Sequence, residues 1–362
     1  MKIRYYISGH GLGHASRSCQ VINTLRRRHP EIAVEVVSDA HSWFFAGFLD
    51  PAVPVRRRRL DLGVLQRGSL VMEEEATLRA YRRFLPERER AVAEEAASLR
   101  REGVSLVVAD IPPAAFAAAK RAGLPAVALG NFSWDWIYED FALRHRGYGD
   151  VLVSVREDYA GADLLLRLPF HGEFPAFSRI EDLPLVARRG SLPPAEVRAR
   201  LGIPVGRRVG LLSFGGFGLE DFDFSGLAKL QDWTFLSGAD RPWTGPNLQL
   251  IPQGLFAYPD LVRASDVVVT KPGYGIVSEA IANGTAVLYT PRGDFREQEV
   301  LVAALKRYAR CREIDNAALL SGRWGASLEA LLAQPGPREP LALDGDLVAA
   351  ERLAQLAGGV RA

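Results

Sequence analysis

Cysteine is nearly absent from this chain of 362 residues, in which Cys19 and Cys311 are the only two. Cysteines so few and so far apart form neither a disulfide framework nor a zinc-binding pattern. Such a low content is typical of proteins that stay in a reducing compartment. We therefore expect a cytoplasmic protein that binds no metal.

Long apolar runs and a strong net charge are also missing. No run reaches the roughly 18 apolar residues of a membrane span, and residues 1–11 have the pattern of a first strand rather than of a signal peptide. The net charge of +2 argues against a general nucleic-acid binder, because few counterions would be released. We expect no transmembrane segment and no nucleic-acid partner.

Residues 266–298 are the most informative stretch of the chain. Their first part, 266–270, is apolar and β-branched like a buried strand, and the Pro- and Gly-containing residues 271–275 break it. A helix over 276–282 should follow, ended by an Asn-Gly pair before a second buried strand over 286–290. A strand, turn, helix and strand in this order predict a parallel sheet and an α/β fold.

The turn of this unit should lie at the carboxyl edge of the sheet, where backbone N–H groups and the helix dipole attract anions. Gly273 and Gly275 would let a phosphate approach the main chain. Ser278 and Glu279 lie one turn further on, and because a carboxylate repels a phosphate, Glu279 suits a ribose diol better. The alternative is an ordinary turn with a solvated glutamate.

A second Gly-rich turn, residues 9–17, joins a first strand over 2–8 to the first helix. Its spacing is G-x-G-x-G, with His14 where a dinucleotide-binding fingerprint has its last glycine. Asp39, at the end of a second strand over 32–38, keeps a dehydrogenase open as the less favoured alternative.

Two histidines in the first turn, His10 and His14, are its more telling feature. His14 would occupy the first turn of the helix, where the dipole favours the neutral ring, which suits a base or a hydrogen-bond donor to phosphate. His10 could act in the same way from the loop, or it could only cap or pack the turn.

Polar residues follow two later strands at the same predicted edge. Asp110 ends the strand that begins at 105, and Asn131 and Asp135 follow the strand over 126–130. Carboxylates and an amide at one rim suit the recognition of sugar hydroxyls. We therefore expect these residues on the same edge as the first-turn histidine.

Aromatic residues accompany these polar groups. Trp134 and Trp136 flank Asp135, and an indole can stack on the apolar face of a sugar. We expect one of the two in the site and the other in the core. Asp61 begins a loop over 61–66 that could also face a cleft.

The segment from Gly273 to Gln298 resembles the donor-binding half of GT-B glycosyltransferases, especially the family of the peptidoglycan N-acetylglucosaminyltransferase that acts on lipid I. In that family a Gly-rich turn precedes a Ser-Glu pair whose Glu binds the ribose of the UDP-sugar, and an Arg-Gln-Gln triplet lies by the donor sugar. Glu297 stands here in place of the first Gln, which leaves the donor sugar open. The matching residues are Gly273, Gly275, Ser278, Glu279, Arg296, Glu297 and Gln298.

A closer resemblance, running nearly end to end, is to the glycosyltransferase-like N-terminal region of plant L-arabinokinases. No P-loop of the form G-x-x-x-x-G-K-[ST] is present, so we expect a free-standing version of that region without kinase activity. The segments that carry this resemblance are 9–17, Asp110, 131–135, 157–159, 166–169 and 214–216.

The resemblance implies the GT-B fold: two Rossmann-like, doubly wound parallel-sheet domains that face each other across a cleft. Length agrees with about two domains. We expect an N-terminal acceptor domain over 1–175, a linker over 176–194, a C-terminal nucleotide-sugar-binding domain over 195–340, and a last helix in 341–362 that crosses back to the first domain.

The resemblance also implies a function: metal-independent, inverting transfer of a sugar from a nucleotide-sugar, with UDP the expected nucleotide, to an acceptor hydroxyl. His14 or Asp110 would be the base, and we favour His14 because histidine accepts protons near neutral pH. No cofactor is expected besides this co-substrate. Two alternatives stay open: an epimerase or hydrolase of nucleotide-sugars with this fold, and a non-catalytic nucleotide-sugar-binding regulator.

The expected binding residues fall into two groups. On the donor side we expect backbone amides to stabilise the leaving diphosphate without a metal ion. The donor-binding residues are Gly13, Phe214, Gly215, Gly216, Leu255, Lys271, Gly273, Gly275, Ser278, Glu279, Arg296, Glu297 and Gln298. The acceptor-binding residues are His10, Asp61, Asn131, Trp134 and Asp135.

Overall fold

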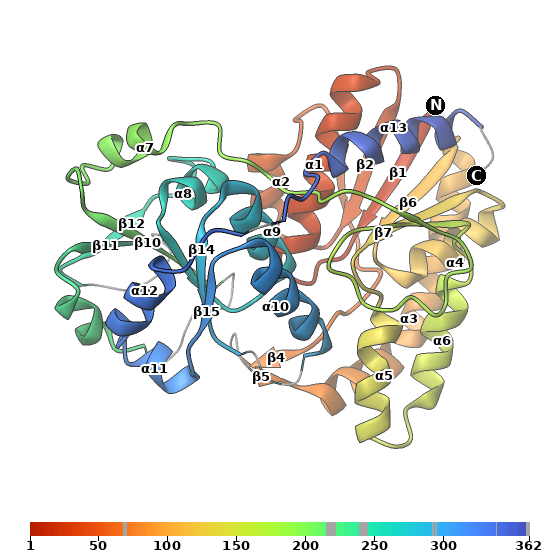
Figure 1. Ribbon diagram of the computed structural model, residues 1–362. Helices are drawn as coiled ribbons and strands as arrows, with labels where there is room; N and C mark the ends of the chain where they lie inside the picture. Colours follow the sequence, from red (N-terminus) through yellow and green to blue (C-terminus); the bar gives the residue numbers. More distant parts are fainter. Residues whose placement is uncertain are drawn as a thin grey trace. The chain divides into compact units, whose positions relative to one another are not determined.

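Strands and helices alternate along most of the chain in the computed structural model (Figure 1). The structure describes residues 1–67, 71–214, 222–238, 245–291, 293, 295–337 and 339–359. Contacts divide the chain into two compact units. Unit 1 comprises Met1–Leu65, Met72–Val186 and Ala342–Ala362, and unit 2 comprises Gln66–Val71 and Ala187–Leu341.

Unit 1 contains a seven-stranded sheet in the order β3-β2-β1-β6-β7-β8-β9. Every neighbouring pair in it is parallel. The inner strands are apolar on both faces because helices cover both sides of a parallel sheet. The strands are β1 (Lys2–Ile7), β2 (Ala33–Ser38), β3 (Val55–Arg57), β6 (Leu106–Asp110), β7 (Ala126–Gly130), β8 (Leu164–Arg167) and β9 (Ile180–Asp182).

The last strand of this sheet lies in a segment for which the sequence predicts a linker. Ile180–Asp182 pairs in parallel with β8, so a strand lies inside the predicted linker 176–194. This strand has three residues, two of them acidic, and only its pairing with β8 identifies it.

One helix of unit 1 carries a proline in its interior. The helix Glu74–Arg101 (α3) continues through Pro86. The helices are α1 (Leu12–Arg28), α2 (Ser42–Phe48), α3 (Glu74–Arg101), α4 (Pro113–Ala122), α5 (Trp134–Arg144), α6 (Gly149–Tyr159) and α13 (Gly345–Ala357).

The C-terminal helix α13 belongs to unit 1, where it lies beside α1 (Figure 1). Asp346 accepts hydrogen bonds from Gln20 Nε2 at 3.0 Å and from Thr24 Oγ1 at 2.5 Å. At the other end of α1, Arg28 pairs with Glu351 at 2.8 Å. The end of the chain is thereby fixed to the first helix of the same unit.

Unit 2 contains a six-stranded parallel sheet in the order β12-β11-β10-β13-β14-β15. Adjacent residues of one strand serve opposite cores: Leu211 belongs to one apolar cluster and Leu212 to the other. Both faces are therefore covered, as in a doubly wound sheet. The strands are β10 (Arg208–Ser213), β11 (Trp233–Gly238), β12 (Leu248–Ile251), β13 (Val267–Thr270), β14 (Ala286–Tyr289) and β15 (Cys311–Glu313).

The predicted strand, turn, helix and strand of unit 2 are confirmed as β13, α9 and β14. Gly284 ends α9 in the left-handed conformation, with φ of 70°.

The helices of unit 2 are α7 (Pro194–Arg200), the 3₁₀ helix η2 (Phe224–Lys229), α8 (Tyr258–Ala264), α9 (Tyr274–Asn283), α10 (Arg296–Tyr308), α11 (Asn316–Leu320) and α12 (Gly325–Leu332). Two short strands, β4 (Gln66–Arg67) and β5 (Val71–Met72), form a separate ladder.

Candidate functional site

The carboxyl edge of the unit 1 sheet brings together residues that are far apart in the sequence. Strands β1, β6 and β7 are neighbours in this sheet. His14 lies in the first turn of α1, just after β1; Asp110 ends β6; and Asn131 follows β7. All three side chains are buried.

One carboxylate is the centre of this cluster. Asp110 accepts a hydrogen bond from His14 Nδ1 at 2.8 Å and one from Ser18 Oγ at 2.9 Å. Arg17 donates two hydrogen bonds to the same carboxylate, from Nε to Oδ2 at 2.6 Å and from Nη2 to Oδ1 at 2.6 Å. Its third nitrogen, Nη1, donates to Asn131 Oδ1 at 2.5 Å. The charged groups are thus paired inside the cluster.

The electrostatics of this cluster decide which nitrogen of His14 carries the proton. Burial alone would raise the pKa of Asp110, but the Arg17 charge and the His14 ring outweigh it and lower that pKa to about 2. Asp110 is therefore ionised at neutral pH and can only accept hydrogen bonds. Nδ1 of His14 lies closer to this carboxylate, at 2.8 Å, than to Arg17 Nη2, at 3.0 Å, and the tautomer that donates from Nδ1 to Asp110 leaves the lone pair of the neutral ring on Nε2. His14 can accept a proton at Nε2.

A second buried acid lies near this histidine. Asp61 Oδ2 accepts a hydrogen bond from Trp134 Nε1 at 2.8 Å. Burial raises the pKa of Asp61 to about 6, and its hydrogen bonds with Ser8 and Trp134 offset that rise only in part. The Trp134 ring in turn lies 6.1 Å from the His14 ring and 5.2 Å from the His10 ring, measured between centroids.

The predicted acceptor-binding residues are gathered here, but mostly below the surface. Asn131, Trp134 and Asp135 are fully buried, and Asp61 is nearly so. Burial also raises the pKa of Asp135, which lies 3.4 Å from Arg156 Nε. Such positions suit residues that hold others in place better than residues that touch a ligand, and a direct contact with an acceptor stays a prediction.

His10 and the second tryptophan have clear structural contacts. His10 Nδ1 accepts a hydrogen bond from the Val64 backbone N–H at 3.3 Å, and a side chain at Gly63 would collide with the His10 ring. Trp136 is buried, and Gly172 is packed against its indole so closely that a Cβ would clash. Trp134 is buried as well, so both tryptophans pack inside the unit, and a contact of either with a sugar stays a prediction.

In unit 2 some of the predicted donor residues lie just before α9 or within it. Gly273 precedes the helix in an extended conformation. Ser278 is 1% exposed, and its Oγ has no hydrogen-bond partner among the described residues. Glu279 is buried as well, and Arg188 contacts its Oε1 with Nε at 2.7 Å and Nη2 at 2.6 Å.

The other residues predicted to bind the donor differ in how exposed they are. Phe214 is buried after β10, whereas Leu255 is 54% exposed in a loop. Glu297 is buried in the first turn of α10. Partly exposed positions are Gly13 in unit 1 and Lys271, Gly275, Arg296 and Gln298 in unit 2. Gly215 and Gly216 lie outside the described residues.

Two arginines of these clusters were not predicted from the sequence. Arg17 follows His14 by three residues, a spacing that places both side chains on one face of a helix, so the pattern contained a usable signal. Arg188 meets Glu279 across 91 residues of chain, in the segment that enters unit 2, and no local pattern indicates that contact.

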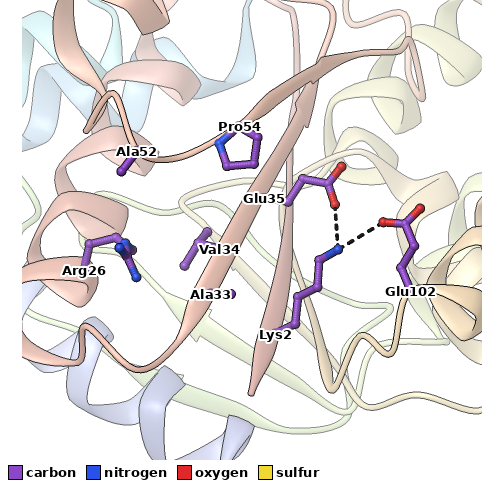
Figure 2. Close-up of a pocket in the computed structure, with 8 residues that line it drawn as sticks. All are labelled: Lys2, Arg26, Ala33, Val34, Glu35, Ala52, Pro54 and Glu102. Atoms are coloured by element: carbon purple, nitrogen blue, oxygen red, sulfur yellow. Dashed lines mark hydrogen bonds and ion pairs between the residues drawn. The ribbon is translucent and has the colours of Figure 1, made fainter.

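A separate cavity of about 360 Å³ opens at the opposite edge of the unit 1 sheet, where β1 and β2 begin (Figure 2). Figure 2 shows Lys2 directed toward two carboxylates, Glu35 at 3.4 Å and Glu102 at 3.0 Å. The charges that line this cavity thus pair with each other, and the cavity lies apart from the histidine cluster.

The described residues contain no group of three or more His, Cys, Asp or Glu side chains that could hold a metal ion. Within the same part of the chain, the helices are too short or too polar to cross a membrane.

Comparisons with known proteins identify the architecture. Residues 1–137 match a family model described as glycosyl transferase family 1. Over 333 residues the chain is 32% identical to L-arabinokinase of Arabidopsis thaliana; the match covers 90% of this chain but 31% of that protein's length. The chain therefore spans less than a third of the curated relative.

Solved glycosyltransferases share the fold over nearly the whole chain. The calicheamicin glycosyltransferase CalG4 superimposes with a TM-score of 0.62 at 18% identity, covering 99% of this chain and 94% of that one. A UGT transferase from Siraitia grosvenorii, solved in complex with UDP, gives 0.57 at 12% identity, with 99% of both chains covered. Two parallel sheets of seven and six strands and these superpositions confirm the predicted GT-B fold.

Proposed function

We propose that this chain, a GT-B protein whose first 137 residues match glycosyl transferase family 1, moves a sugar from a nucleotide-sugar to an acceptor hydroxyl. The observation that carries the proposal is the hydrogen bond between His14 and an ionised Asp110 at the carboxyl edge of a sheet. This arrangement supplies an oriented base of the kind that activates a hydroxyl nucleophile.

In the proposed step, His14 Nε2 takes the proton of the acceptor hydroxyl while that oxygen bonds to the anomeric carbon of the donor sugar. The bond from that carbon to the diphosphate breaks, and the leaving nucleoside diphosphate keeps the electron pair. Asp110 stabilises the imidazolium that forms. A single displacement of this kind inverts the anomeric configuration, so we propose an inverting enzyme.

We propose that unit 2 binds the donor. The start of α9 offers backbone N–H groups and the positive end of a ten-residue helix to a diphosphate. The buried hydroxyl of Ser278 and the carboxylate of Glu279 lie one turn further on, where a ribose could be bound. UDP is the proposed nucleotide, because the fold neighbour from Siraitia grosvenorii was solved with UDP. Stabilisation by these amides would need no metal ion.

We make two further proposals, on the acceptor site and on the cellular location. We propose that the residues before the predicted linker 176–194 bind the acceptor, and that the protein works in the cytoplasm. The identities of the donor sugar and of the acceptor are left open.

A binding experiment tests the donor site without knowledge of the acceptor. Thermal unfolding of the wild-type protein is followed with a panel of UDP-, dTDP- and GDP-sugars. A ligand present at about 100 times its Kd should add roughly 2.7 kcal/mol to the stability of the unit that binds it. We expect one nucleotide class, UDP, to raise the unfolding temperature.

Matched variants locate the binding. Glu279→Ala should abolish the shift, and Ser278→Ala should weaken it. The control Glu329→Ala removes another glutamate of unit 2, largely exposed and paired with Arg208, and should leave the shift unchanged. A shift that survives Glu279→Ala would place the nucleotide elsewhere.

Incubation with the donor alone separates transfer from the other reactions of this fold. Rapid formation of an epimer, or rapid release of UDP without an acceptor, would favour an epimerase or a hydrolase. Retention of intact donor until an acceptor is added would support transfer.

A further inference from the structure

Arg17 has the contacts of a residue that organises the histidine cluster. It is 4% exposed and bonds two side chains, Asp110 with two nitrogens and Asn131 with the third. Its Nη2 also lies 3.0 Å from Nδ1 of His14. A planar guanidinium makes all of these contacts at once, which a lysine ammonium cannot do.

The charge of Arg17 opposes that of Asp110 at the histidine. A carboxylate beside an imidazole favours the protonated ring, whereas a guanidinium at the same distance disfavours it. With His14 neutral, the Arg17 and Asp110 charges cancel, and a proton on His14 would leave the buried cluster with a net positive charge. Such a net charge is costly away from water.

We propose that Arg17 is a positioning residue of the histidine site: it fixes the Asp110 carboxylate against Nδ1 of His14, and its positive charge opposes the charge that the ring gains when it takes a proton. This meaning for catalysis rests on the proposed transferase function. The effect on protonation can be measured without any substrate.

The charged and titratable groups around His14 come from several elements. Arg17 lies on the same helix, Asp110 comes from β6, and Asp61 comes from the segment after β3. His10 faces the shared Trp134 ring from the turn before α1. Each substitution at Arg17 leaves these other three groups unchanged.

The test follows the ring signals of the histidines by NMR as a function of pH in ¹³C- and ¹⁵N-labelled full-length protein. Comparison with His14→Gln assigns the signal of His14 among the six histidines. In Arg17→Gln, which removes the charge but can still donate to Asp110, we expect the titration midpoint of His14 to move up by about one pH unit.

Two further variants test the direction in which charge moves the titration midpoint of His14. Arg17→Lys keeps the charge and should leave the midpoint within a few tenths of a pH unit of wild type. Asp110→Asn removes the opposite charge and should move the midpoint down. A matched control, Arg28→Leu, removes an arginine about 16 Å further along the same helix, where it pairs with Glu351, and should move nothing.

Each outcome decides the proposal. An unchanged midpoint in Arg17→Gln, with a far-ultraviolet CD spectrum like that of wild type, would overturn it. If Arg17→Gln does not fold, Arg17→Met, which also removes the charge but keeps an apolar stem, takes its place, and an unchanged midpoint in that variant would also overturn the proposal. Midpoints that move as expected in a protein that transfers no sugar would leave the role of Arg17 intact and reject the proposed function.

Discussion

His14, Arg17 and Asp110 carry one positive and one negative charge between them in a buried site. Removing the negative charge of Asp110 takes away the carboxylate that accepts two hydrogen bonds from the buried guanidinium, and breaking such a buried pair typically costs about 3 kcal/mol or more. We therefore expect Asp110→Asn to destabilise unit 1 by that order at pH 7, as measured by urea unfolding.

The pH dependence of this loss follows from the lowered pKa of Asp110, about 2 in the folded protein against 3.8 for the ordinary residue. A lowered pKa means that the ionised group stabilises the fold above pH 4, and that this contribution disappears as the pH falls toward 2. The difference between wild type and Asp110→Asn should shrink over that range. A difference that stays constant from pH 7 to pH 2.5 would contradict the assignment.

Asp61 should behave in the opposite way. Burial raises its pKa to about 6, above the ordinary 3.8, so its contribution to stability is greatest below pH 4 and falls as the pH rises to 6. Asp61→Asn should therefore be more stable than wild type at pH 8, by roughly 1–3 kcal/mol, and nearly equal to it at pH 4. Urea unfolding at the two pH values measures this, and an equal effect at both would count against a buried, proton-binding carboxyl.

At the scale of elements, α13 depends on a close approach at its first residue. A Cβ at Gly345 would collide with the backbone oxygen of Pro184, which cannot move away as a flexible side chain could. Gly345→Ala should destabilise unit 1 by about 2 kcal/mol in thermal or urea unfolding. Gly358→Ala, at the other end of the same helix, meets only ordinary contacts and should stay within about 0.5 kcal/mol. Equal effects of the two would refute this packing.

Replacing Pro86 should raise the stability of the fold rather than lower it. It is exposed within the 28-residue helix α3, where a proline removes a backbone hydrogen bond and crowds the preceding turn. Pro86→Ala should stabilise α3 by up to about 3 kcal/mol, measured as a higher urea midpoint. A loss of stability would mean that the fold requires the proline.

The elements were predictable where local pattern and packing agree. The strands over 126–130 and 267–270 are short, apolar and bounded by turn residues, and both formed as expected. The strand Ile180–Asp182 was not predicted from the sequence because neighbouring structure decides it: a largely acidic tripeptide becomes a strand by pairing with β8.

At the scale of the molecule, the GT-B fold followed from the Gly-rich turns and the family resemblance. The edge that unites His14, Asp110 and Asn131 was predictable too, because all parallel strands present their carboxyl ends to one edge. The partners of these residues were not. Arg17 had only a spacing to indicate it, and the Arg188 contact with Glu279 depends on how distant segments meet.

Mass spectrometry can detect sugar transfer from UDP-sugars to a library of hydroxyl-bearing acceptors. We predict that wild type releases one UDP for each acceptor glycosylated, and that His14→Gln, in a protein that still binds the donor, is slower by a factor of about 100 or more. Transfer at an undiminished rate in His14→Gln, or UDP release that no acceptor accelerates, would contradict this prediction.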